Sequence, residues 1–180
     1  MPETKDNHHT TFACVNFIID KLTRSGVRDL TNLKLQKLLY FAYGLHLVLF
    51  EKPLFEDEYF EAWQYGPVLR SVYKEFKNFG KDNPIAINYR IFVIEDGDQF
   101  IDIIPPISDE KKIKSLLYAC LYYGSKTAWQ LVDILHDGKN SAWNEVYEKG
   151  KNNIIPLEKI QNEFSSEIVK IEEYISNVLK

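Results

Sequence analysis

The chain has only two cysteines, one methionine and 8 glycines among its 180 residues. Cys14 and Cys120 each stand alone inside an apolar helical pattern, so we expect two buried thiols in a reducing cytosol. No pair of cysteines has the spacing of a zinc site. A chain of this length can bury enough surface to fold without a disulfide or a metal. The sequence therefore predicts neither.

Motifs of catalysis are also missing. No glycine-rich loop follows an expected strand as phosphate binding requires, and neither H-E-x-x-H nor G-x-S-x-G occurs. His8 and His9 fall in a polar tail. His46 lies on an apolar helix side, where a hydrogen-bonded core residue is usual, and His136 ends a helix, where a structural or capping role is expected. We therefore predict no enzyme and no cofactor; a hydrolytic site would have to unite His46 or His136 with a carboxylate.

The sequence has no excess of positive charge and no long apolar run. Its net charge is −4 and its pI is about 5.6, which argues against a broad nucleic-acid footprint. The longest apolar stretch, Leu38–Phe50, contains His46 and is too short to span a bilayer. The first eleven residues are polar and carry Glu3 and Asp6, so they do not resemble a signal peptide. We expect a cytoplasmic protein without membrane contact.

Aromatic residues are plentiful, with 11 Tyr, 11 Phe and 3 Trp. Tyr and Trp combine a large contact area with a polar tip, so they serve both cores and recognition surfaces. The apolar spacing predicts a mainly α fold: a flexible tail over residues 1–10 and a single compact multi-helix domain over residues 11–180. The central helix is expected over Leu30–Phe50. Thr31 is its cap, and apolar residues cover nearly its whole circumference, which is typical of a helix buried by its neighbours.

The remaining elements follow from caps, breakers and periodicity. We expect helices or short helical segments at Thr11–Arg24, Gly66–Phe79 with Pro67 as its first residue, Ser108–Tyr123 with Ser108 as its cap, Ala128–Leu135, Ser141–Glu148 and, as one long amphipathic helix, Leu157–Leu179. Tyr59–Tyr65 is expected to be extended. A small β-hairpin is expected where Asp96-Gly97 joins two runs rich in β-branched and aromatic residues, and it should lie against the helices.

Two lysines near the start of the central helix are unusual. Lys34 and Lys37 lie about 60° apart in projection and oppose the positive end of the helix dipole, a cost of roughly 0.3–1 kcal/mol each. One interpretation is that this end of the helix is exposed and uses its charge to bind a partner. The alternative is that both lysines cover apolar surface with their stems.

The segment around Trp63 and Tyr65 is the second unusual feature. Two aromatic residues two positions apart in an extended run point to the same face, directly before Gly66-Pro67. This segment either forms a packed corner that fixes the next helix or offers aromatic anchors for recognition.

These two segments resemble a known family. The run K-L-Q-K-L-L-Y-F-A at residues 34–42, then Pro53-Leu54-Phe55, and then E-A-W and Y-G-P-V at residues 61–63 and 65–68 are similar to the Panacea domain, the SocA-like, GepA-type phage-associated antitoxins. The similarity continues more loosely through residues 128–131, His136 and Ala142-Trp143. It implies the antitoxin of a bacterial or phage toxin–antitoxin pair, which binds and neutralises a cognate toxin by direct contact, as a possible homo-oligomer or as a hetero-oligomer with the toxin.

Candidate partner-binding residues follow from both features: Lys34, Lys37, Tyr40, Trp63, Tyr65, Gly66 and Pro67. Two other functions stay open. One is an adaptor that delivers a toxin or phage protein to a protease through its N-terminal tail. The other is a DNA-binding regulator of its own operon, suggested by helix–turn–helix-like spacing in Lys126–Leu135, although the negative net charge counts against it.

Overall fold

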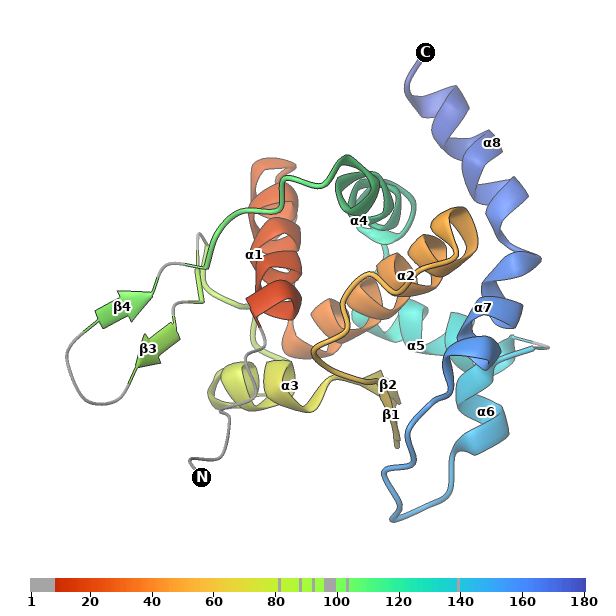
Figure 1. Cartoon of the computed structure of the whole chain (residues 1–180), viewed down its shortest axis with the longest axis horizontal. Coiled ribbons are helices and arrows are strands. Elements are labelled where there is room, and N and C mark those ends of the chain that lie inside the picture. Colours follow the sequence, from red (N-terminus) through yellow and green to blue (C-terminus); the bar gives the residue numbers. More distant parts are fainter. Residues whose placement is uncertain are drawn as a thin grey trace.

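The structure is a computed structural model that describes residues 9–80, 82–87, 89–91, 93–95, 100–102, 104–138 and 140–180. Over this part of the chain it is mainly α-helical, as predicted (Figure 1). The helices are α1 (His9–Arg24), α2 (Asn32–Phe50), α3 (Arg70–Phe76), α4 (Glu110–Tyr123), α5 (Ala128–Asp137), α6 (Ala142–Val146), α7 (Leu157–Ser165) and α8 (Ile168–Val178), with a 3₁₀ turn at Lys77–Phe79. Two antiparallel hairpins pair β1 (Glu61–Trp63) with β2 (Gly66–Val68) and β3 (Val93–Glu95) with β4 (Phe100–Asp102). Among these residues, no helix has the length and apolar character needed to cross a bilayer.

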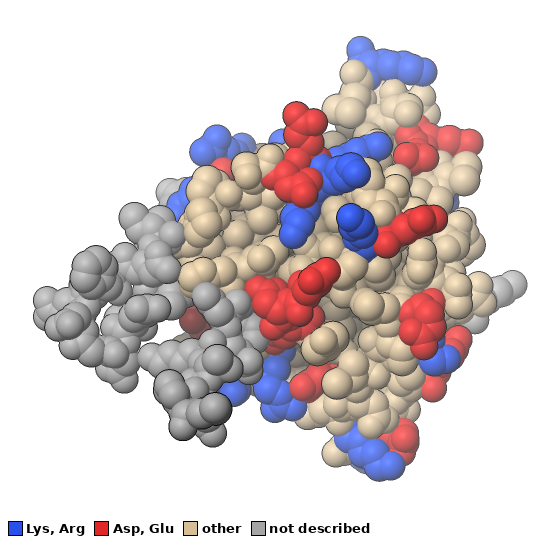
Figure 2. Space-filling view, viewed as in Figure 1, with Lys and Arg blue, Asp and Glu red and all other residues tan. Residues whose placement is uncertain are grey.

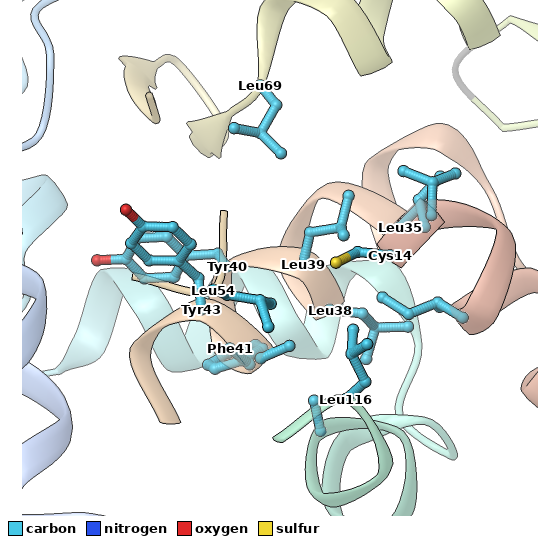
Figure 3. Close-up of a cluster of buried hydrophobic side chains, with 14 of the residues drawn as sticks. Cys14, Leu35, Leu38, Leu39, Tyr40, Phe41, Tyr43, Leu54, Leu69 and Leu116 are labelled. Carbon is cyan, nitrogen blue, oxygen red and sulfur yellow. The ribbon is translucent and has the colours of Figure 1, made fainter. Parts of the chain in front are cut away.

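Helix α2 is the centre of the molecule. It contacts α1, α3, α4, α5, α7 and β2, and in Figure 1 these elements surround it. Thr31 caps it as predicted, because its side-chain oxygen accepts a hydrogen bond of 3.2 Å from the Lys34 amide. Leu35, Leu38 and Leu39 are completely buried together with Cys14 of α1 (Figure 3). Burying each leucine contributes roughly 1.5–3 kcal/mol. The predicted buried central helix and the predicted burial of both cysteines are confirmed.

Close packing of α7 on α2 depends on Gly44. A Cβ at this position would overlap the ring of Phe164, which sits directly over the glycine. The same ring packs edge-on against Tyr40 and Phe41, with centroids 5.7 and 5.9 Å away. Gly44 therefore sets how near α7 can approach the central helix.

The C-terminal segment is two helices, so the prediction of one long helix over Leu157–Leu179 is wrong. Helix α7 ends at Ser165 and α8 begins at Ile168. α7 buries its apolar stripe against α2, whereas α8 packs on α4 and extends from the body of the molecule (Figure 1). The change of partner requires a change of direction, and the stripe alone does not reveal it because neither Pro nor Gly stands at the break.

The starts of α3 and α4 differ from the prediction. Pro67 lies inside β2 and α3 begins at Arg70, because residues 61–68 form a hairpin before the helix can start. Helix α4 is capped by Asp109 rather than by Ser108, since the Asp109 carboxylate accepts from the amides of Lys111 and Lys112. The helix start at Thr31 is confirmed, and α5 begins at Ala128 as predicted; Thr127 caps it and forms a capping box with Gln130.

The predicted hairpin between residues 90 and 104 is confirmed as β3 and β4, with Ile94 opposite Ile101. The predicted Asp96-Gly97 turn lies outside the described residues. The hairpin is anchored on α1 at its base, where Asn16 Oδ1 accepts from the Ile91 amide at 2.9 Å. Helix α1 begins at His9, two residues before the predicted start, so residues 9 and 10 of the predicted tail over residues 1–10 are helical. Residues 1–8 lie outside the described part of the chain.

Candidate partner-binding site

The two motifs that stand out in the sequence meet in space. Residues of the first two turns of α2 lie beneath the hairpin β1–β2 and hold the chain that follows it. Gln36 pairs with both backbone groups of Leu69: its Oε1 accepts from the amide at 2.8 Å and its Nε2 donates to the carbonyl at 3.2 Å. Asn32 Nδ2 donates to the Tyr73 carbonyl at 3.3 Å. Buried backbone groups that fall outside a regular ladder thus gain side-chain partners.

Lys37 is the most unusual member of this support. Its side chain is completely buried, and Nζ donates to the Pro67 carbonyl at 3.0 Å. No carboxylate forms an ion pair with it among the described residues. Burial lowers the pKa of Lys37 from 10.5 to about 7, because a charged ammonium loses its hydration in the interior.

The expected exposure of this end of α2 is therefore wrong. Lys34 is also buried, and its Nζ lies 2.7 Å from the Asp29 carboxylate. Neither lysine presents its charge to solvent, because Lys37 lies under the hairpin, about thirty residues further along the chain, and buried Lys34 is paired with Asp29.

Gly66 makes room for the buried ammonium. Its φ is +102°, in the region that favours glycine, and a Cβ built there would lie 2.9 Å from Lys37 Nζ. The Gly-Pro pair therefore serves the hairpin and its contact with Lys37 rather than a helix start.

Helix α6 supports the other strand of the hairpin. Trp143 Nε1 donates to the Trp63 carbonyl at 2.7 Å. The Trp143 ring stacks on His136 of α5, with the rings 4.1 Å apart and 5° from parallel. Burial, and then the charge of Lys37, lower the pKa of His136, so the neutral imidazole is favoured rather than a charged cap. Its Nε2 is buried and has no hydrogen-bond partner within the described structure.

The outer surface of the hairpin is aromatic. Strand β1 ends at Trp63, and Tyr65 stands in the turn that follows, so the two do not share one extended run as predicted. Trp63 is half-buried and packs against Tyr73 of α3, with centroids 4.8 Å apart. Tyr65 packs edge-on against Trp129 of α5 at 5.4 Å. We call Trp63, Tyr65, Tyr73 and Trp129 the aromatic surface; the last three are 39%, 40% and 43% exposed.

A groove of about 470 Å³ opens beside this surface. Its lining is mostly apolar, and the described part of it contains one charged residue, Lys77. The lining residues are Asn32, Leu33, Gln36, Trp63, Gln64, Tyr65, Val68, Tyr73, Lys77 and Gly80. The sequence did not single out Tyr73, Trp129 or Lys77, because each lies on a different element and only the fold brings them together.

Tyr40, another predicted binding residue, is completely buried. Its hydroxyl donates to Glu163 Oε2 at 2.6 Å, and the same oxygen accepts from the Ala142 amide at 3.1 Å. Burial raises the pKa of Glu163 to about 7 despite these two hydrogen bonds. Tyr40 thus joins α2 to α6 and α7 and cannot touch a partner in this arrangement.

His46, which was considered for a hydrolytic site, has structural contacts, and so do two carboxylates of the loop after α2. His46 is buried and its Nδ1 lies 2.9 Å from the Ser115 hydroxyl, as expected of a core histidine. Asp57 accepts hydrogen bonds from the Thr10 and Thr11 amides at the start of α1, and Glu58 accepts from the Ser71 amide in the first turn of α3. Burial raises the pKa values of both cysteines to about 12. Among the described residues, no group of three His, Cys, Asp or Glu side chains could hold a metal ion.

The charges on the face seen in Figure 2 are mixed. Lys and Arg side chains occur there as separate small groups, many of them beside Asp or Glu, and they do not join into one basic area. Examples of such pairs within the described chain are Arg70 with Glu61 and Lys151 with Glu148. A nucleic-acid footprint needs clustered cations, which this face does not offer.

Comparison with known proteins agrees with this geometry. The family model for the Antitoxin SocA-like, Panacea domain matches residues 35–144, which include Gln36, Lys37, the hairpin β1–β2 and Trp143. Antitoxin SocA of Caulobacter vibrioides (strain NA1000 / CB15N) is 35% identical over 124 residues, covering 69% of this chain. The match spans 63% of the length of that relative. No solved structure matches. The chain belongs to the SocA-like antitoxins of the Panacea domain family.

Proposed function

We propose that this protein neutralises a cognate toxin by binding it directly, and that the aromatic surface and its groove form the contact. The observation that carries the proposal is the placement of Tyr65 and Trp129. Both are large aromatic residues that stand partly exposed on an internally braced hairpin and an adjoining helix. Aromatic residues dominate the binding energy of many interfaces.

Rigidity of the hairpin supports the same function. Lys37, Gln36 and Trp143 fix the backbone at Pro67, Leu69 and Trp63 with hydrogen bonds from beneath. A surface that is ordered before binding loses less conformational entropy when the partner arrives. We thus propose a structural role inside the fold for five of the predicted partner-binding residues, whereas the other two, Trp63 and Tyr65, lie at the surface. The five are Lys34, Lys37, Tyr40, Gly66 and Pro67.

Co-expression with the product of the adjacent gene tests the proposal. Native protein should restore growth and co-purify with that product, and light scattering of the complex gives its stoichiometry. Tyr65→Ala and Trp129→Ala should each weaken binding by about 1–2 kcal/mol, roughly five- to thirtyfold. Both side chains are half-exposed, so the variants should fold.

Val169→Ala is the matched control, because Val169 is an exposed apolar residue on α8, away from the hairpin. It should bind like the native chain. If no complex forms with the native protein, or if all three variants bind alike, the proposed contact is wrong. Both partners are expected to meet in the cytoplasm.

A further inference from the structure

We infer that the groove beside the aromatic surface receives an aromatic side chain of a partner protein that has a carboxylate next to it, with the ring against Trp63, Tyr65 and Tyr73 and the carboxylate paired with Lys77. This inference rests on the proposed function only in taking the toxin as the partner that supplies the ring.

The walls of the groove favour a flat apolar group. Trp63, Tyr65 and Tyr73 line it, and Leu33 and Val68 add aliphatic surface. Aromatic rings prefer edge-to-face or offset contacts with one another, worth about 0.5–1.5 kcal/mol beyond the area they bury. A volume near 470 Å³ is within the range of sites that enclose small ligands, so it accommodates an aromatic side chain together with its neighbour.

Charge selects among aromatic ligands. Aromatic walls alone would also suit a cation, which binds ring faces. Lys77, however, is the one charged side chain among the described residues that line the groove, and it makes no ion pair with any of the described residues. The neighbouring cation Arg70 is already paired with Glu61 at 2.8 Å and lies over the Trp63 ring at 5.7 Å. An incoming cation would therefore meet repulsion, whereas a carboxylate would find an uncommitted ammonium.

Three probes that share one ring test this inference without any toxin. Indole-3-propionate, indole-3-propionamide and tryptamine carry a negative, a neutral and a positive group on the same indole. Each is titrated into the full-length, ¹⁵N-labelled chain, and the resonance of the Trp63 Nε1–H is followed by NMR. We expect the propionate to bind tightest, about two- to fivefold over the amide, as for one exposed ion pair, and tryptamine to bind weakest.

Charge reversal at the groove gives the matched comparison. Lys77→Glu should reverse the order of the propionate and tryptamine. Lys74→Glu should preserve it, because Lys74 is an exposed cation of the preceding helix that does not line the groove. If no probe shifts Trp63, the groove does not take a ring. If Lys77→Glu leaves the order unchanged, or if tryptamine binds tightest to the native chain, carboxylate recognition is wrong.

Failure here is distinguishable from failure of the proposed function. Toxin that co-purifies with a chain to which no probe binds refutes the groove occupant and leaves direct neutralisation standing. If the probes bind in the predicted order but the chain forms no complex with the toxin, the groove occupant is supported and direct neutralisation is refuted.

Discussion

Lys37 places an ammonium in the interior opposite a single carbonyl, and this arrangement links folding to pH. The folded pKa is about 7 and the ordinary value is 10.5. Between these values the unfolded chain holds a proton that the folded chain has released. Folding stability therefore rises with pH over this interval.

We predict that the contribution of Lys37 to the free energy of unfolding increases by several kcal/mol between pH 7 and about pH 9.5. Lys37→Met keeps the apolar stem and removes the titrating group, so it should flatten the rise. Urea denaturation at a series of pH values measures the free energy of unfolding of the native chain and of the variant. Lys34→Met, at the other buried lysine, is the control and should keep the rise; an equal slope in the native chain and in Lys37→Met would contradict the burial of this charge.

Gly66 should tolerate substitution poorly, because it lies directly against the buried ammonium of Lys37. Gly66→Ala combines an unfavourable positive φ with a Cβ 2.9 Å from Lys37 Nζ, so we expect a loss of roughly 1–3 kcal/mol and weaker toxin binding. Gly150→Ala is the matched control, because Gly150 has a φ of +80° but no atom within 4 Å of the place that a Cβ would take. It should cost only the strain of the backbone. Thermal denaturation and co-purification separate the two effects.

At the scale of elements, the contact between α2 and α7 depends on a missing side chain. A glycine in the middle of a helix normally costs about 0.5–1 kcal/mol relative to alanine. Here the ring of Phe164 occupies the space that a Cβ would need. The local cost in helix propensity is offset by close packing of the two helices.

We therefore predict that Gly44→Ala destabilises the protein, by about 1–3 kcal/mol, instead of stabilising it as helix propensity alone would suggest. The double variant Gly44→Ala/Phe164→Ala should lose less stability than the sum of the two single changes, since the smaller residue removes the overlap. Chemical denaturation of the four proteins of this cycle gives the coupling energy. Additive losses would show that the two residues do not compete for one space.

Elements with strong local signals were predictable from the sequence. Thr31 with an apolar circumference indicated α2, the helical pattern from Ala128 indicated α5, and an Asp-Gly pair between β-branched runs indicated the hairpin β3–β4. The break between α7 and α8 was not predictable, because it comes from packing on two different helices and carries no breaker residue.

On the scale of the whole molecule, the candidate site was predictable only in part. The motif residues Lys37 and Pro67 do meet, but the sequence could not show that the lysine supports the hairpin from inside. That relation depends on a hairpin which folds over the start of α2 and on Trp143, eighty positions from Trp63. Tyr73, Trp129 and Lys77 lacked a local signal for the same reason: each gains its role only from neighbours that are distant in the chain.

The internal bracing of the hairpin separates two requirements that most binding loops must satisfy with the same residues. The atoms that keep the β1–β2 chain in shape belong to Gln36, Lys37 and Trp143, while Gln64, Tyr65 and Trp129 are exposed. Randomising only those three exposed positions should therefore yield a library whose members keep the parent fold. Such a library offers a route to redirect the molecule toward a different target by changing its exterior alone.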